Sequence, residues 1–214
     1  MKKESLVNIP IPPTLGLVLA GGLARRMGGG DKARITIGGS TILDRVLATL
    51  SGQCVDIVIN ANGDPERFAD TGCVVVADSV PDFAGPLAGI LAGLDWLAAQ
   101  NNGIEWLASV PGDCPFLPDD LVERLHAARR EKGTALACAR SGEWRHPVVA
   151  LWPLALREDL RKALVEEGLR KIEIWTARHG VAIADWPDTP VDPFFNVNTP
   201  EDAERASHLA AQHS

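Results

Sequence analysis

The sequence predicts an α/β fold, namely a single-domain three-layer sandwich built around a mostly parallel sheet. Short apolar runs alternate with segments whose apolar residues recur at helical spacing. Glycine-rich or polar turns follow several of the apolar runs, as at the carboxyl ends of strands in an open α/β sheet. The 214 residues suit one large domain, and we expect residues 1–14 to be an N-terminal extension and residues 15–211 to form the domain.

The predicted strands are short and continuously apolar, which is typical of strands buried on both faces. They cover residues 15–20, 55–60, 73–77, 105–110, 134–139 and 148–152, with 180–186 as an edge strand. Between them, apolar residues at spacings of three and four predict helices near residues 43–50, 87–98, 121–128 and 156–164. Thr41 with Asp44 resembles a capping box, and Thr199, Pro200 and Asp202 predict the start of a last helix.

Bulk properties exclude several classes of protein. The formal net charge of −7 and a pI near 5.2 argue against a broad nucleic-acid surface. No signal peptide and no apolar run of membrane-spanning length is present, so we expect no membrane partner. The four cysteines lack Cys-x-x-Cys spacing, which indicates free structural thiols and a reducing compartment. The expected location is therefore the cytoplasm.

The strongest local signal is the glycine-rich segment LAGGLARRMGGGDK, residues 19–32, directly after the first predicted strand. Its glycines allow backbone amides to converge on a ligand, and Arg25, Arg26 and Lys32 add positive charge, so the segment suits a polyphosphate. It lacks the Gly-Lys-Ser/Thr of a Walker loop and the Gly-x-Gly-x-x-Gly of a dinucleotide fold. A solvated surface loop remains the alternative interpretation.

A second signal is Pro111-Gly112-Asp113-Cys114-Pro115, which follows the predicted strand 105–110. A carboxylate at the end of a strand can bind Mg²⁺, an ion that needs only one or two carboxylates besides phosphate oxygens. The alternative is that Asp113 is an ordinary turn residue. No role is expected for Cys114.

Together these segments resemble the molybdenum cofactor guanylyltransferase family, whose members have a Rossmann-like sheet of the glycosyltransferase-A type. The matching residues are Leu19-Ala20-Gly21-Gly22, Arg26-Met27-Gly28 and Asp31-Lys32, then Gly85-Pro86-Leu87-Ala88-Gly89, His146-Pro147 and Asn196-Val197-Asn198-Thr199-Pro200. The resemblance extends from about residue 14 to residue 205 and leaves the N-terminal extension outside. It implies transfer of GMP from Mg²⁺-GTP to molybdopterin-bound molybdenum, giving a guanine dinucleotide cofactor and pyrophosphate.

The resemblance also implies roles for particular residues. Lys32 and Arg26 would stabilise phosphate charge, and Asp113 would bind Mg²⁺. Contacts to the nucleotide or the acceptor would come from Leu19, Ala20, Gly21, Gly22, Lys32, Asn60, Asp78, Gly85, Pro86, His146, Asn196 and Asn198. From the residues alone, Asn60 and Asp78 also fit turns, His146 a structural side chain, and Asn196–Asn198 a helix cap.

Three alternatives stay open. The first is a cytidylyltransferase that acts on the same pterin, although the Gly21-Gly22 pair mildly favours guanine. The second is a sugar-phosphate or isoprenoid nucleotidyltransferase, which His146-Pro147 and the Asn196–Thr199 stretch disfavour. The third is a non-catalytic chaperone that binds nucleotide and cofactor, against which Asp113 and Lys32 argue. The expected partners are GTP and the molybdopterin cofactor, with apo-molybdoenzymes or their chaperones as recipients of the product.

Overall fold

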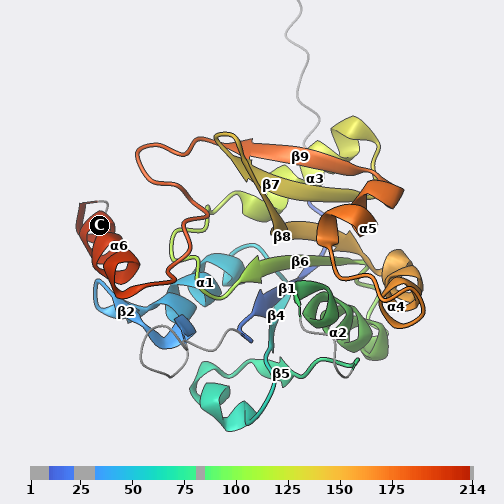
Figure 1. Ribbon diagram of the computed structural model, residues 1–214, viewed down its shortest axis with the longest axis horizontal. Helices are drawn as coiled ribbons and strands as arrows, with labels where there is room; N and C mark the ends of the chain where they lie inside the picture. The colour runs from blue at the N-terminus through green and yellow to red at the C-terminus, as the bar shows by residue number, and fades with distance from the viewer. Residues whose placement is uncertain (1–9, 22–31, 81–84, 213–214) are drawn as a thin grey trace, which may run out of the picture.

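The computed structural model describes residues 10–21, 32–80 and 85–212, and seven strands form its central sheet. In spatial order β5-β4-β1-β6-β8-β7-β9, the sheet runs through the middle of the molecule (Figure 1). The strands are β1 (Thr14–Leu19), β4 (Asp56–Asn60), β5 (Val74–Val76), β6 (Trp106–Pro111), β7 (Leu136–Ser141), β8 (Trp144–Pro153) and β9 (Val181–Trp186). A separate two-stranded ribbon joins β2 (Thr36–Ile37) to β3 (Ser40–Thr41).

The pairing of the strands determines where their ends meet. β1 pairs in parallel with both β4 and β6, and Leu19 lies opposite Asn60 on one side and Pro111 on the other. β5 is parallel to β4, and β9 is parallel to β7. Only β8 among these strands of the described chain is antiparallel to its neighbours. The expected mostly parallel sheet is confirmed, and the carboxyl ends of β1, β4, β5 and β6 share one edge.

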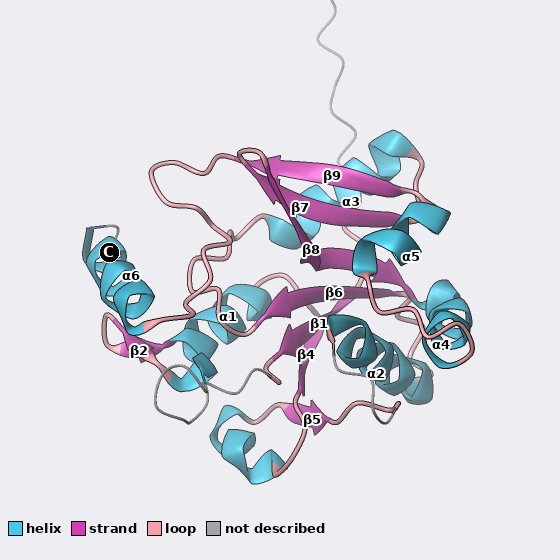
Figure 2. Cartoon of the chain, viewed as in Figure 1, coloured by secondary structure: helices cyan, strands magenta, loops and turns pink. Residues whose placement is uncertain are grey.

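Helices cover both faces of this sheet, as Figure 2 shows in cyan. On one face lie α1 (Ile42–Ser51), α3 (Leu121–Lys132) and α6 (Pro200–Gln212), whose buried residues share one apolar cluster. On the other face lie α2 (Pro86–Gln100), α4 (Arg157–Val165) and α5 (Ile172–His179), which share a second cluster. Short 3-10 helices occur at η2 (Lys32–Arg34), η3 (Pro65–Thr71) and η4 (Leu154–Leu156). This is the predicted three-layer sandwich.

Local signals for helix starts are confirmed. Thr41 and Asp44 cap α1 reciprocally, side chain to backbone, as a capping box requires. At α6, the Asp202 amide donates to Thr199 Oγ1, and the Asp202 carboxylate accepts from the amides of Asn198 and Thr199. None of the described helices is both long and apolar enough to cross a lipid bilayer.

One placement was wrong. His146 and Pro147 were expected to precede a strand, but they lie within β8, which begins at Trp144. The first residues of β8 pair with the end of β7 beyond a bulge at Cys138/Ala139, so the hairpin extends past its apolar part. The apolar pattern begins only at Val148, and polar residues such as Arg145 precede it. The sequence pattern therefore did not predict that the strand starts at Trp144.

Candidate functional site

Two pockets lie at the edge where the parallel strands end. The first, here called the Asp78 pocket, has a volume of about 360 Å³ and is lined by Leu19, Gly21, Asn60, Asn62, Asp78, Gly85 and Pro86. The second, the Asp113 pocket, has a volume of about 380 Å³ and is lined by Pro111, Asp113, Cys114, Arg145, His146, Pro147, Val148, Val149, Phe194, Asn196 and Asn198. They adjoin across β1 and β6, because the Gly112 amide donates to the carbonyl of Leu19 at 3.0 Å.

Side-chain amides hold the carboxylate of Asp78 in its pocket. Asn60 Nδ2 donates to Asp78 Oδ1 at 3.0 Å and to the carbonyl of Val76 at 3.1 Å. Asn62 Nδ2 donates to Asp78 Oδ2 at 2.8 Å, and its Oδ1 accepts from the Asp78 amide. Each carboxylate oxygen keeps a lone pair for a ligand. Asp78 is therefore a fixed hydrogen-bond acceptor for the N–H or O–H groups of a ligand.

Close packing of α2 permits this arrangement. Gly89, in the first turns of α2, lies so near Asn60 that an added Cβ would overlap its side-chain amide and approach Leu19 Cδ2 to 2.7 Å. Gly85 has φ 148°, a conformation that favours glycine, and Pro86 begins the helix. The Gly-Pro-Leu-Ala-Gly segment therefore brings α2 against the pocket.

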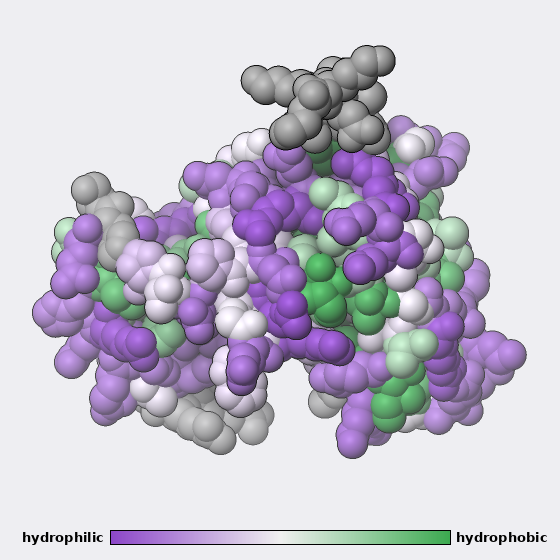
Figure 3. Space-filling view, turned by 90° about the horizontal axis from the view of Figure 1, so that it is seen from above, coloured by the Kyte–Doolittle hydropathy of each residue, from purple (hydrophilic) through white to green (hydrophobic). Residues whose placement is uncertain are grey.

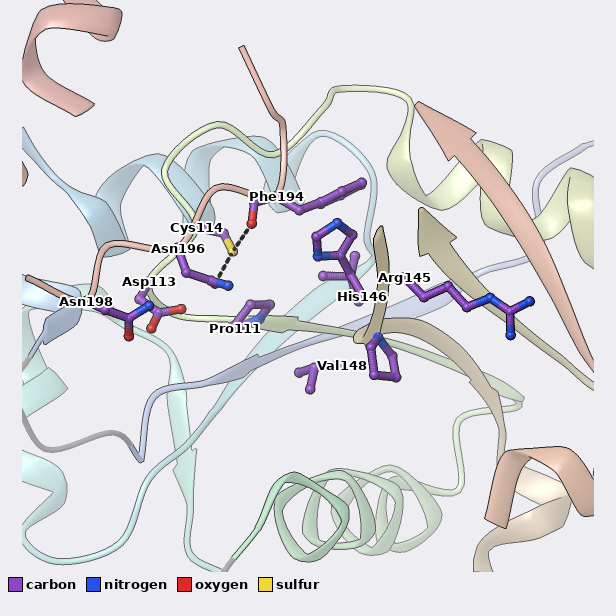
Figure 4. A pocket seen from close by; sticks show the side chains of 11 residues that line it. Pro111, Asp113, Cys114, Arg145, His146, Val148, Phe194, Asn196 and Asn198 are labelled. Atoms are coloured by element: carbon purple, nitrogen blue, oxygen red, sulfur yellow. Dashed lines mark hydrogen bonds between the residues drawn. The ribbon is translucent and has the colours of Figure 1, made fainter. Parts of the chain in front are cut away.

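The carboxylate of Asp113 lies in the loop after β6, facing the second pocket (Figure 4). Burial raises the pKa of Asp113, and the nearby positive charge of Lys32 partly opposes that shift. The carbonyl of Asp113 accepts from the amide of Val197 at 2.9 Å, which joins this loop to the segment before α6. Residues far apart in the sequence thus meet around one carboxylate.

Lys32 lies beside the Asp113 pocket. Its Nζ donates to Asn198 Oδ1 at 2.7 Å, and its charge acts on Asp113. It lies in η2, directly after the glycine-rich segment. The structure therefore brings Lys32, Asp113 and Asn198 together.

His146 lies on the far side of the Asp113 pocket. Its Nε2 is 2.7 Å from Ser141 Oγ, and its ring packs against Phe194 with centroids 4.8 Å apart. Burial lowers the pKa of His146, while the carboxylate of Asp192 opposes that shift. The ring is thus neutral at physiological pH, and it forms part of the pocket wall.

The predicted site residues divide into the two pockets. Leu19, Gly21, Asn60, Asp78, Gly85 and Pro86 line the first, and Asp113, His146, Asn196 and Asn198 line the second. Ala20 lies beside them, its amide donating to the carbonyl of Asn60. Gly22 and Arg26 lie outside the described residues. Sequence reasoning missed Asn62, Cys114, Ser141 and Phe194; of these, only Asn62, two residues after Asn60, carried a recognisable signal.

Adjoining pockets at the carboxyl edge of such a sheet suit a protein that brings two ligands together, and solved nucleotidyltransferases share the fold. A structure of molybdopterin-guanine dinucleotide biosynthesis protein A from Archaeoglobus fulgidus matches with TM-score 0.70 at 23% identity, over 92% of this chain and 99% of that one. A 4-diphosphocytidyl-2C-methyl-D-erythritol synthase from Anaerococcus prevotii matches with TM-score 0.69 at 15% identity, over 94% and 96%. At such identities the likeness concerns the fold alone.

Closer relatives define the family. Residues 16–180 match the model described as the MobA-like NTP transferase domain, and the chain belongs to that family of nucleotidyltransferases. A protein from Nitrobacter hamburgensis named molybdenum cofactor guanylyltransferase is 61% identical, over 96% of this chain and 98% of its own length. A protein of the same name from Bradyrhizobium sp. is 59% identical, over 92% of each.

Proposed function

We propose that this chain transfers GMP from GTP to the terminal phosphate of the molybdopterin-bound molybdenum cofactor. The products are molybdopterin guanine dinucleotide and pyrophosphate. The observation that supports the proposal is the pair of pockets at the ends of the neighbouring strands β1 and β6, with the carboxylate of Asp113 lining one of them and Lys32 beside it. Within this proposal, residues 15–211 form the catalytic domain; most of the expected N-terminal extension, residues 1–9, lies outside the described residues.

The Asp78 pocket would hold the nucleoside. A carboxylate with free acceptor capacity suits guanine, whose N1–H and 2-amino group form an adjacent pair of donors. Cytosine offers only its 4-amino group on the corresponding edge, beside an N3 acceptor that a carboxylate repels. The fixed orientation of Asp78 between Asn60 and Asn62 thus supports guanine over cytosine. Leu19, Ala20 and Gly21 would approach the nucleotide through the backbone, with Gly22 and Arg26 continuing the phosphate loop.

The Asp113 pocket would hold the acceptor. An oxygen of the acceptor phosphate attacks the α-phosphorus of GTP, a new P–O–P linkage forms, and pyrophosphate leaves with the bonding electron pair. A phosphate monoester is already ionised near pH 7, so no general base is required. Lys32 would stabilise the charge that develops on the phosphates, and Asn196 and Asn198 would orient the acceptor.

A divalent cation fits the carboxylate of Asp113. The described residues contain no group of three or more His, Cys, Asp or Glu side chains that could bind a metal by themselves. Mg²⁺ does not need such a group, since it binds one or two carboxylates together with substrate phosphates and water. Burial that disfavours the negative charge of Asp113 also strengthens its attraction for a cation. When bound, Mg²⁺ would neutralise part of the phosphate charge.

We place the reaction in the cytoplasm, with apo-molybdoenzymes or their chaperones as recipients of the product. The cysteines Cys54, Cys73, Cys114 and Cys138 are all free thiols, which supports a reducing compartment.

The decisive experiment measures pyrophosphate release with Mg²⁺ and molybdenum-loaded molybdopterin, comparing GTP, CTP and ATP. We expect turnover with GTP, and loss of turnover in Asp113→Ala that still folds. Turnover with CTP instead would contradict the assignment of the base but keep the reaction class. Nucleotide binding without turnover would contradict the proposal and favour a cofactor-binding chaperone.

A further inference from the structure

The buried thiol of Cys114 joins the two loops that form the Asp113 pocket. Its Sγ lies 2.9 Å from Asn196 Oδ1 and 3.6 Å from the carbonyl oxygen of Phe194, as the dashed lines in Figure 4 show. Cys114 is 1% exposed, so solvent does not compete for these contacts. Together with the hydrogen bond from the Val197 amide to the Asp113 carbonyl, the thiol fixes the segment before α6 against the loop after β6.

A thiol in this position determines which end of the Asn196 amide faces the pocket. The neutral thiol has one proton to donate, and the Asn196 oxygen is its nearer acceptor. If Asn196 Oδ1 is held by sulfur, its Nδ2 with two N–H groups is left for the pocket. The opposite orientation would direct a carbonyl oxygen at any anion that enters.

The chemistry of the acceptor makes this orientation important. An ionised phosphate offers only hydrogen-bond acceptors, so it binds to N–H groups and is repelled by a carbonyl oxygen. Asn198, which lines the same pocket, is oriented in a comparable way, because its side-chain oxygen accepts from Lys32 and its Nδ2 is left to donate.

We infer that Cys114 is a positioning residue for the acceptor: by donating to Asn196 Oδ1, it directs the Asn196 N–H groups toward the acceptor phosphate. This inference rests on the proposed function. Burial raises the pKa of the Cys114 thiol well above its ordinary value, and the charges of Asp113 and Asp192 raise it further.

The test varies the acceptor and GTP separately in steady-state assays. Cys114→Ala removes the donor, and we expect the KM for the acceptor to rise about tenfold, the size expected for losing a charge-assisted hydrogen bond. The KM for GTP should change less than about twofold, because the Asp78 pocket is untouched. Cys114→Ser keeps a donor and should restore most of the acceptor affinity. Cys138→Ala is the matched control, since Cys138 is also buried but lies in β7 outside both pockets.

A double-mutant cycle tests whether Cys114 affects the KM for the acceptor through Asn196. If Cys114 acts through Asn196, the substitution Cys114→Ala should have almost no further effect on acceptor KM in an Asn196→Ala background. An additive effect there, or a Cys114→Ser variant as impaired as Cys114→Ala, would overturn the inference and leave the proposed function intact. Absence of turnover in the unsubstituted protein would contradict the proposed function, and the inference with it.

Discussion

At the scale of single residues, Asp113 carries a charge that its own surroundings disfavour. Burial raises its pKa, and the charge of Lys32 and a backbone hydrogen bond only partly offset this. A carboxyl group whose pKa is raised on folding makes the folded state less stable as the pH rises and the group ionises. At neutral pH the ionised form of Asp113 therefore does not stabilise the fold. Ionisable side chains with a perturbed pKa, such as this one at the end of a strand, are typical of functional sites.

Replacing Asp113 by Asn should therefore lower the activity without lowering the stability of the fold. We expect turnover to fall by about three orders of magnitude, because the charge proposed to bind the cation is lost. The melting temperature at pH 7 should stay the same or rise, because the disfavoured charge is gone. Pyrophosphate release and thermal unfolding measure the two effects. Asp119→Asn, six residues further along on the exposed surface, serves as control. A cooperative loss of stability in Asp113→Asn would instead indicate a structural role.

Lys32 is the second residue whose function can be tested by itself. Lys32→Met preserves most of the side-chain volume and removes the charge, so we expect the dissociation constant for GTP to rise about tenfold. Equilibrium binding of a fluorescent GTP analogue measures it. Lys132→Met at the exposed end of α3 removes the same charge elsewhere and should have no effect. Equal affinity in both variants would exclude Lys32 from the nucleotide site.

At the scale of elements, α2 packs unusually close to the sheet through its glycines. Besides the contact of Gly89 with Asn60, a Cβ on Gly93 would lie 2.9 Å from side-chain atoms of both Leu107 and Leu17. These two glycines lie on the same face of α2, one turn apart. The first faces the Asp78 pocket and the second faces the core between β1 and β6.

Gly89→Ala and Gly93→Ala form a matched pair. Both should destabilise the fold, by about 1–3 kcal/mol for overpacking against the sheet. Only Gly89→Ala should also raise the KM for GTP, because it displaces Asn60 and with it Asp78. Denaturant unfolding and steady-state kinetics compare the variants. If both raise the KM equally, close packing of α2 in general, and not the position of Asn60, controls nucleotide binding.

The elements differ in how well the sequence predicts them. Strands buried on both faces and helices with caps carry local signals, as β4 and α1 illustrate, and both were predicted. The helix α5 was missed, because its N-cap Lys171 makes no side-chain cap hydrogen bond and one of its three buried residues is the polar Thr176. Its position depends on the stacking of Trp175 against Trp152 of β8, a contact between elements that no local pattern reveals.

At the scale of the whole molecule, most polar groups lie on the surface, as the purple areas of Figure 3 illustrate for one face. His126 of α3 is an exception, since it is completely buried at the end of the sheet opposite to the pockets. Its Nε2 lies 2.8 Å from Thr14 Oγ1, and that hydroxyl donates to the carbonyl of Pro12. The Nε2 must therefore carry the proton, and Nδ1 has no partner among the described residues.

This histidine predicts a loss of stability in acid. Burial, with the charges of Arg129 and Arg130, lowers the pKa of His126 to about 4. In the unfolded chain it takes up a proton below about pH 6.5, so folding becomes less favourable as the pH falls from about 6.5 to 4, by up to about 3 kcal/mol. His126→Gln should remove this slope, whereas replacing the exposed His208 should not. Urea unfolding at several pH values measures it, and identical slopes would contradict the prediction.

The site was less predictable than the fold from physical patterns alone. Asp113 and the glycine-rich segment follow predicted strands, so their position at the sheet edge could be deduced. The partners of Cys114, by contrast, are 80 and 82 residues away in the sequence, and they meet it only when the segment before α6 folds back along the sheet. Hydrogen bonds over such separations depend on tertiary packing, which composition and periodicity do not encode locally.

The hydrogen bond between Lys32 and Asn198 spans 166 positions of the chain. The segments around Lys32 and Asn198 therefore depend on each other, and a fragment of the chain that lacks either one cannot complete the wall of the Asp113 pocket.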